Sequence, residues 1–337
     1  MHDVLLIGSG ITAATALQSL AGSCRVVGLV RNVSLAGPVS DEIARLAPRF
    51  GTPVFTDTSI AGVRDAIDRL HPDCVVVSSY DRVLPEDVLG RCPFVNVHYA
   101  PLPRLRGRAN VNWAVINQDP FTAITIHQMA AGLDAGDILF QRSVPIHSTD
   151  TVADLYERLN ALQLEHLGPV VERFLDGVPM IQRQDEKLAT YGCTRVPSDG
   201  EIDWSASTRS IDALVRALAS PFPGAFTHVD GRRLIIRRAR PLDPPPVYEG
   251  RVAGRVIRVS REDGAVDVLT GDGVLRLFEV QAERGGVVSA ASVIRSLRTT
   301  LGLTSVDLLA RIEALERELD ALRASIPVTG AHNVLVS

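Results

Sequence analysis

Short apolar runs alternate with stretches of helical periodicity along the first half of the chain. The apolar runs predict strands at residues 4–7, 25–30, 74–77, 94–97, 123–128 and 138–144. Helical spacing predicts helices at residues 11–20, 41–46, 61–70 and 110–117, and a longer one that Asp150 caps and that runs to about Leu175. Apolar strands that alternate with helices are typical of a mostly parallel sheet covered on both faces. We therefore predict an α/β fold for this half.

The pattern changes after residue 180. Residues 181–200 are polar and irregular, and a helical stretch follows at 207–219. Short strands split by Asp-Gly turns come next, near residues 224–229, 233–240, 251–259, 265–269 and 274–280. This alternation of short strands and tight turns predicts a small antiparallel barrel.

A charged helix is predicted near the C-terminal end. Its apolar residues are spaced four and three apart: Leu308, Ile312, Leu315, Leu319 and Leu322. Such spacing is the seam of a coiled coil, here about two heptads long. The seam can dock on the protein's own body or contact a second copy in a homodimer, and the sequence leaves both open.

A chain of 337 residues is too long for most single cores, so two domains are expected. We predict a first domain at residues 1–180, a linker at 181–200, a barrel domain at 201–300 and the C-terminal helix at 304–325. We find no internal repeat that would suggest another organisation.

Charge and cysteine content exclude several classes of protein. A net charge of −4 gives no general attraction to nucleic acid or to an anionic membrane. No run is long enough to span a bilayer, and no charged region precedes the short N-terminal apolar run, so we expect neither a membrane span nor a signal peptide. The four cysteines are scattered without a CxxC pair. They predict reduced thiols in the cytoplasm and no metal site.

Three polar side chains carry the candidate chemistry. Asn96 and His98 stand two residues apart in a predicted strand, so both point to the same face. Asp134 stands in a Gly-Asp loop between two predicted strands. An amide can donate to a developing oxyanion, an imidazole can move a proton near neutral pH, and a carboxylate can fix that imidazole or accept a proton. Asp137 is expected to brace the loop, while His127 is open to a structural or a substrate-binding role.

In these motifs the chain resembles the formyltetrahydrofolate-dependent formyltransferases. Their signature stands here as Asn96-x-His98, Leu102-Pro103-x-x-Arg106-Gly107 and Leu133-Asp134-Ala135-Gly136-Asp137. The resemblance runs from the first strand to roughly residue 300. It implies a Rossmann-like catalytic domain followed by an OB-like barrel. It also implies an N-formyltransferase with 10-formyltetrahydrofolate as co-substrate, in which Asn96 and His98 stabilise the oxyanion and Asp134 handles the proton.

The same resemblance implies where the folate binds. In such enzymes the backbone of the loop after the third long strand holds the pterin, and a second loop lies on its other side. These positions are Arg82, Val83 and Leu84 here, with Ala130, Ala131, Gly132 and Leu133 opposite. Arg108 is a candidate partner for the folate carboxylate or a substrate phosphate, although a solvated loop arginine is the plainer interpretation.

The acceptor is expected to be a small primary amine, and among such amines a nucleotide-linked amino sugar is the favoured candidate. Arg106-Gly-Arg108 and Asn112-Trp113 resemble the sugar-nucleotide members, although Asn110 stands where those enzymes commonly have proline. The tRNA enzyme of this family carries a basic insertion after the second strand. Residues 33–51 are not basic overall here, which disfavours tRNA and leaves methionyl-tRNA formyltransferase as the alternative.

Two interpretations from other classes remain. Gly8-x-Gly10 after a strand fits a dinucleotide fingerprint, and Arg31 at the end of the second strand could suit the 2′-phosphate of an NADP-dependent oxidoreductase. A non-catalytic binding module would keep the fold but has no need of Asn96, His98 and Asp134 together.

Overall fold

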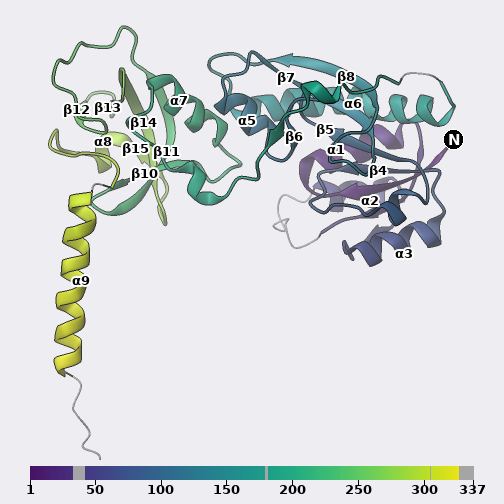
Figure 1. Ribbon diagram of the computed structural model, residues 1–337, viewed down its shortest axis with the longest axis horizontal. Coiled ribbons are helices and arrows are strands. Elements are labelled where there is room, and N and C mark those ends of the chain that lie inside the picture. The colour runs from purple at the N-terminus through teal and green to yellow at the C-terminus, as the bar shows by residue number, and fades with distance from the viewer. Residues whose placement is uncertain (33–41, 179–180, 304, 326–337) are drawn as a thin grey trace, which may run out of the picture. The chain divides into compact units, whose positions relative to one another are not determined.

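The computed structural model describes residues 1–32, 42–178, 181–303 and 305–325 (Figure 1). The chain forms two compact units. The first comprises Met1–Gly200 with Ala213–Pro223, and the second comprises Glu201–Asp212 with Gly224–Ser337. Each is described separately below.

A seven-stranded sheet forms the centre of the first unit, in the order β3-β2-β1-β4-β5-β7-β8. These strands are β1 (Asp3–Gly8), β2 (Arg25–Val30), β3 (Val54–Phe55), β4 (Cys74–Ser78), β5 (Phe94–His98), β7 (Phe121–Gln128) and β8 (Ile138–Pro145). The strands from β3 to β5 run parallel, and β7 is antiparallel to both β5 and β8. The prediction of a mostly parallel sheet is confirmed. The two-residue β3 was too short to give a sequence signal.

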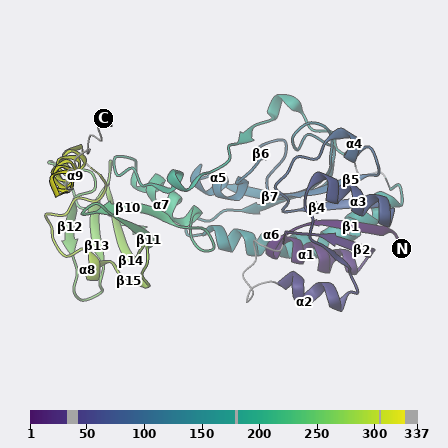
Figure 2. The same cartoon turned by 90° about the horizontal axis from the view of Figure 1, so that it is seen from below.

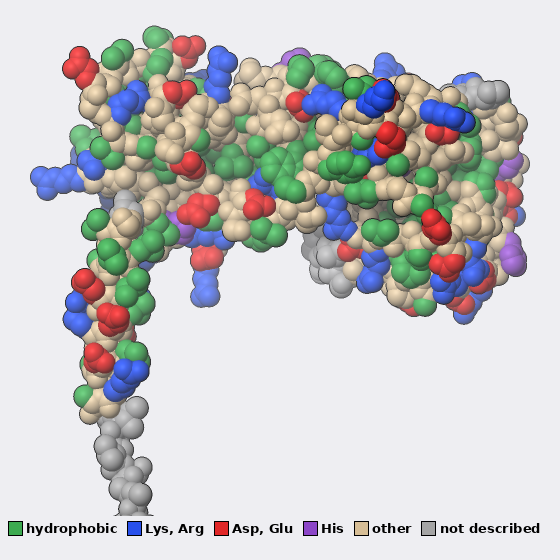
Figure 3. Space-filling view, in the orientation of Figure 1, with side chains coloured by type: hydrophobic (Ala, Val, Ile, Leu, Met, Phe, Trp, Pro, Cys, Tyr) green, Lys and Arg blue, Asp and Glu red, His purple; other side chains and the backbone are tan. Residues whose placement is uncertain are grey.

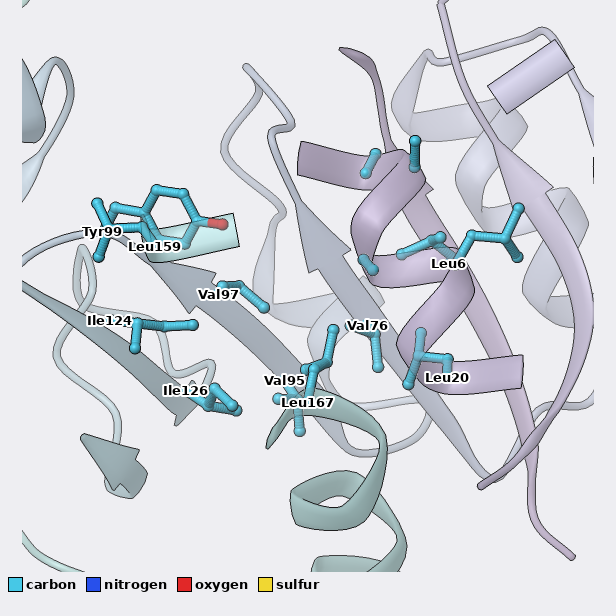
Figure 4. Close-up of a cluster of buried hydrophobic side chains, with 14 of the residues drawn as sticks. Leu6, Leu20, Val76, Val95, Val97, Tyr99, Ile124, Ile126, Leu159 and Leu167 are labelled. Carbon is cyan, nitrogen blue, oxygen red and sulfur yellow. The ribbon is translucent and has the colours of Figure 1, made fainter. Parts of the chain in front are cut away.

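Helices cover both faces of this sheet (Figure 2). On one face lie α1 (Gly10–Ala21), α2 (Glu42–Arg49), α5 (Asn110–Ile116) and α6 (Val152–Leu175), and on the other lie α3 (Ile60–Leu70) and α4 (Glu86–Leu89). Figure 4 shows the larger core, in which Leu20 and Leu167 from two helices meet Val76 and Val95 from the sheet. This packing excludes water from the base of the strands that carry the site.

The N-cap of helix α6 stands one residue later than predicted. Thr151 is the N-cap: its hydroxyl accepts from the backbone N–H of Asp154, and the Asp154 carboxylate accepts from the backbone N–H of Thr151. Asp150 is not the cap, because its carboxylate accepts instead from the backbone N–H of His147 and from Arg158. The prediction of Asp150 as the cap is therefore wrong; a reciprocal capping box satisfies two backbone donors at the helix end, and it is the device used here.

The segment predicted as a linker folds onto the first unit. It contains the short helices η1 (Glu186–Leu188) and η2 (Pro197–Gly200) and the strand β9 (Tyr191–Gly192). Strand β9 pairs in parallel with β6 (Arg106–Gly107). Such short pieces have no periodicity to read from the sequence, yet they bring residues 182–192 against the loop that carries Arg106.

The second unit contains a six-stranded antiparallel sheet, in the order β10-β11-β14-β13-β12, with β15 also paired to β14. The strands are β10 (Ala225–Val229), β11 (Arg232–Pro241), β12 (Val256–Val259), β13 (Val266–Leu269), β14 (Val274–Ala282) and β15 (Val287–Ser289). Helix α8 (Ala290–Val293) follows, and helix α7 (Thr208–Ala217) is shared between the two units. The antiparallel sheet domain after the α/β domain is confirmed.

The chain continues into α9 (Ser305–Ser325), drawn in yellow in Figure 1. The predicted helix is confirmed, and its leucine seam is exposed: Leu315 is 46% and Leu322 58% accessible to solvent. Among the described residues, no helix combines the length and the apolar character that a membrane crossing requires.

Candidate active site

Strand β5 carries Asn96 and His98 on one face. Their neighbours Val95 and Val97 point to the opposite face and are buried in the larger core. Asn96 stands opposite Val77 of β4 on one side and His127 of β7 on the other. The alternation of a strand therefore brings three polar side chains, Asn96, His98 and His127, to the same face near the carboxyl end of β5.

The loop between β7 and β8 brings Asp134 to these side chains. Its backbone has a φ of 48°, a left-handed conformation that aspartate tolerates better than most residues. The loop also passes very close to β7: a Cβ on Gly136 would stand 1.9 Å from the carbonyl oxygen of Gln128. Only glycine fits there, and the close approach helps fix the position of Asp134.

The three residues predicted to be catalytic meet at this point. The amide nitrogen of Asn96 is 3.3 Å from Oδ1 of Asp134, and Nδ1 of His98 is 3.6 Å from Oδ2. The backbone N–H of Gly107 also donates to Oδ2, at 2.8 Å. The site is therefore a carboxylate held by one backbone donor and one amide donor, with an imidazole beside it.

The orientation of His98 is set by its other nitrogen. Nε2 lies 2.9 Å from the carbonyl oxygen of Leu105, a contact that is satisfied when Nε2 carries a proton and donates it. A neutral His98 then has its lone pair on Nδ1, on the side of Asp134. Asn110 also approaches Nε2, with its amide nitrogen at 3.1 Å, and donates to the carbonyl of Gly107 at 3.0 Å. Asn110 thus contacts both His98 and the loop of Gly107.

Burial and charge set the ionisation of this pair. Burial lowers the pKa of His98, and the nearby Asp134 carboxylate only partly offsets that shift, so His98 is neutral at neutral pH. Burial by itself would raise the pKa of the Asp134 carboxyl, because it favours the neutral form. The neighbouring imidazoles of His127 and His98 and the backbone N–H of Gly107 outweigh burial and lower the pKa of Asp134 to about 2. Asp134 is therefore a carboxylate throughout the working range of pH.

The low pKa of Asp134 predicts a loss of stability in acid. Because the unfolded chain takes up this proton near pH 3.8 and the folded chain only near pH 2, Asp134 contributes about 2 kcal/mol above pH 4. That contribution is lost as the pH falls from about 4 to about 2. We would measure urea unfolding of the wild type and of Asp134→Asn across this range. The difference between their free energies of unfolding is expected to become smaller as the pH falls. A difference that stays constant would contradict the lowered pKa.

His127 is a member of the site that the sequence left undecided. Its Nε2 lies 3.2 Å from the amide nitrogen of Asn96 and 3.6 Å from Oδ1 of Asp134. Its Nδ1 lies 2.7 Å from the carbonyl oxygen of Gln128. A proton on Nδ1 can be donated to that oxygen, and Nε2 is then an acceptor. The His127 side chain is only 1% exposed, and its contact with the amide of Asn96 helps to orient that amide. No local sequence signal identifies this role, because it depends on the register of β5 against β7.

A second group of side chains holds the Asp134 loop in place. The amide nitrogen of Gln184 donates to the carbonyl oxygens of Asp134 and Gly136, at 2.7 and 2.6 Å. Arg106 in turn donates to the amide oxygen of Gln184 through Nε and one terminal nitrogen, and both terminal nitrogens donate to Glu186. Sequence reasoning missed Gln184, because it stands 50 residues after Asp134 with no local motif.

The residues predicted to hold folate fall on two exposed loops. Arg82 and Val83 are exposed between β4 and α4, whereas the Leu84 side chain is 4% exposed and packs in the smaller core, so only its backbone can face a ligand. On the other loop, Ala130, Ala131, Gly132 and Leu133 are exposed. Arg108 donates to the carbonyl oxygen of Asp81 and so ties its own loop to the first of these.

Other candidates from the sequence have different surroundings. Arg31 is 3% exposed, so its guanidinium is not presented to a 2′-phosphate. The glycine turn after β1 serves internal packing, since a Cβ on Gly8 would meet the carbonyl oxygen of Ser78 at 1.8 Å. Asp137 accepts from Gln128 through its backbone carbonyl, at 2.9 Å. Among the described residues, no three His, Cys, Asp or Glu side chains are grouped so that they could hold a metal ion.

Comparison with solved structures shows a shared fold. HypX from Aquifex aeolicus, in complex with tetrahydrofolic acid, is 19% identical to this chain, with a TM-score of 0.60. The match covers 87% of this chain and 47% of HypX, so the chain spans about half the length of HypX. An N-formyltransferase from Helicobacter canadensis, in complex with folinic acid and dTDP-3-aminofucose, is 16% identical with a TM-score of 0.64 over 82% of this chain and 98% of that one. A sugar N-formyltransferase from Shewanella sp. FDAARGOS_354 is 22% identical with a TM-score of 0.56 over 71% of this chain and 97% of that one.

Comparison with protein families identifies both parts of the chain. Residues 57–171 match the family described as formyl transferase, and residues 196–298 match the formyl transferase C-terminal domain. The first match contains Asn96, His98 and Asp134, and the two matches together span well over half of the chain. The chain therefore belongs to the formyl transferase family.

Proposed function

We propose that this enzyme transfers the formyl group of 10-formyltetrahydrofolate to the primary amine of a nucleotide-linked amino sugar. The observation that carries the proposal is the convergence of Asn96, His98 and Asp134 from two separate segments on one buried point. Acyl transfer to an amine needs a donor for the oxyanion and an acceptor for the amine proton, and this cluster contains both kinds of group.

In the proposed reaction the amine attacks the formyl carbon and a tetrahedral oxyanion forms. Asn96 would donate to that oxyanion the amide N–H that it gives to Asp134 in the free protein, while His127 keeps the amide oriented. One well-placed donor of this kind contributes roughly 3 kcal/mol to transition-state stabilisation. His98 would add a second donor once Nδ1 is protonated.

Proton transfer would be shared by Asp134 and His98. The attacking amine becomes an ammonium as its bond to carbon forms, and the ionised Asp134 would receive one proton, directly or through Nδ1 of His98, which is 3.6 Å away. The leaving folate nitrogen must gain a proton as its bond to carbon breaks, and the same pair would return it. The products are the N-formylated amine and tetrahydrofolate, so atoms and protons balance without a further reactant.

The co-substrate would bind between the two exposed loops. Arg82, Val83 and Leu84 would contact the pterin from one side, and Ala130, Ala131, Gly132 and Leu133 from the other. The hydrogen bond from Arg108 to Asp81 supports this arrangement, because it ties the motif loop to the first of these segments. Structures of the same fold carry tetrahydrofolic acid in HypX and folinic acid in the Helicobacter canadensis enzyme.

The choice of a sugar nucleotide as acceptor rests on two observations. The Helicobacter canadensis enzyme, matched over most of both chains, binds dTDP-3-aminofucose. The second arginine of the Arg106-Gly-Arg108 motif is exposed and could also meet a phosphate. Methionyl-tRNA stays the alternative acceptor, and part of the region that disfavours it, residues 33–41, lies outside the described residues.

Release of tetrahydrofolate tests this proposal. The purified protein would be given 10-formyltetrahydrofolate and a panel of dTDP- and UDP-linked amino sugars, with methionyl-tRNA as a separate arm. We expect turnover with at least one amino sugar, detected by absorbance and by mass spectrometry of the formylated product, and none with His98→Ala. Turnover with methionyl-tRNA alone would overturn the acceptor but keep formyl transfer.

A further inference from the structure

We propose that α9 pairs with α9 of a second copy as a parallel two-stranded coiled coil, so that the enzyme is a homodimer. The helix lies outside both family matches, the second of which ends at residue 298. The helix is therefore not part of either formyl transferase domain. The proposal does not depend on the identity of the acceptor.

An exposed apolar seam is the first observation. With Ile312 and Leu319 at heptad position a, the d positions are Leu308, Leu315 and Leu322. All five side chains are between 46% and 58% accessible to solvent, so the described residues of the second unit do not cover them. Figure 3 shows hydrophobic side chains at the surface along this helix. An isoleucine at a with leucine at d favours two strands. Of the two interpretations that the sequence left open, docking of the seam on the protein's own body has no support in the described residues of the second unit.

Charges beside the seam are the second observation, and they select a second copy as the partner. Arg311 and Glu318 occupy the g positions, and Glu316 and Arg323 occupy the e positions. In a parallel dimer each g residue faces the e residue five positions later on the other helix. Arg311 then faces Glu316 of the partner subunit, and Glu318 faces Arg323 of the partner subunit. Both kinds of pair are attractive and each occurs twice.

The same charges favour the parallel over the antiparallel arrangement. In an antiparallel pair with the seam in register, g residues face g residues and e residues face e residues. Arg311 would still face Glu318, but Glu316 would face the apolar Leu309. Arg323 would extend past the start of the partner helix. The parallel arrangement therefore satisfies four charged positions where the antiparallel one satisfies two.

The remaining charges are compatible with this dimer. Arg317 lies 3.9 Å from Glu313 within the helix, at positions f and b on the side away from the seam. Arg323 lies 3.6 Å from Asp320, one turn earlier. Such exposed pairs within a helix add little, so they do not compete strongly with pairing across the dimer.

Reciprocal charge exchange tests both the dimer and its orientation. One variant exchanges the g charges (Arg311→Glu with Glu318→Arg), and the other exchanges the e charges (Glu316→Arg with Arg323→Glu). Neither changes the net charge. We expect the wild-type chain to sediment as a dimer at micromolar concentration, and each variant alone to dimerise at least about tenfold more weakly. An equimolar mixture restores all four attractive pairs and is expected to form the heterodimer.

Two outcomes would overturn the proposal. A wild-type chain that stays monomeric throughout the micromolar range excludes the dimer, and variants that dimerise as well as the wild type exclude the charge pairing. Orientation is checked by disulfide formation in a Cys193→Ser background. Leu322→Cys is expected to cross-link to itself in a parallel dimer, whereas the matched control Ala324→Cys, at the outer f position, is not; equal cross-linking of both would contradict the parallel seam.

Discussion

Asp134→Asn is expected to lower kcat for formyl transfer by about 10³-fold or more while the protein stays folded. Asparagine keeps the shape of the side chain and can still accept from the N–H of Gly107. It cannot receive the amine proton or hold a charge beside Nδ1 of His98. The loss is therefore expected in the chemical step and not in binding. Single-turnover kinetics with saturating folate measures it directly.

His98→Ala provides the comparison that shows whether the two residues act together. Alone, it is expected to cost as much as Asp134→Asn, because each depends on the other across 3.6 Å. The double variant is then expected to be no slower than either single one, since removal of the second member of a unit adds little. The mechanism would be contradicted if the losses in kcat of the two single variants added in the double variant. It would also be contradicted if either single variant had the wild-type rate at an unchanged melting temperature.

The parts of the site that could be predicted are those with local signals. Asn96 and His98 share a strand, and the period of two places them on one face whatever the rest of the chain does. The loop of Asp134 was recognisable because glycine and aspartate cluster between two apolar strands. The wrong cap at Asp150 shows the limit of such signals, since two neighbouring residues, Asp150 and Thr151, have similar propensity and only the reciprocal bonds with Asp154 decide between them.

The parts that could not be predicted depend on tertiary register. His127 joins Asn96 because β7 pairs with β5 in one particular register, which the sequence of either strand does not specify. Gln184 reaches the Asp134 loop because β9 pairs with β6, and those strands have two residues each. The polar sequence at 181–200 was interpreted as a linker for lack of periodicity. Its hydrogen bonds, and not a buried apolar face, determine where it lies.

Arg106→Met is expected to lower kcat/KM by about 10²-fold, although Arg106 need not touch either substrate. Its side chain is 2% exposed and holds the amide of Gln184, which in turn holds the backbone of Asp134. Methionine keeps the bulk but removes every donor. Gln184 is then free to turn, and a displacement of the Asp134 loop by about 1 Å is enough for such a loss. Steady-state kinetics over a range of pH measures the effect.

Two matched variants distinguish positioning from simple destabilisation. Arg106→Lys keeps the charge but cannot form the forked bonds to Gln184 and Glu186, so it is expected to recover only part of the rate. Glu186→Gln leaves the bonds to Gln184 intact, and since Glu186 is 65% exposed, it is expected to cost little. If Arg106 fixes the geometry of Asp134, Arg106→Met must also shift the pH profile of kcat/KM, because Asp134 sets the charge beside His98. A lower melting temperature with an unchanged pH profile and near wild-type kcat would limit Arg106 to a structural role.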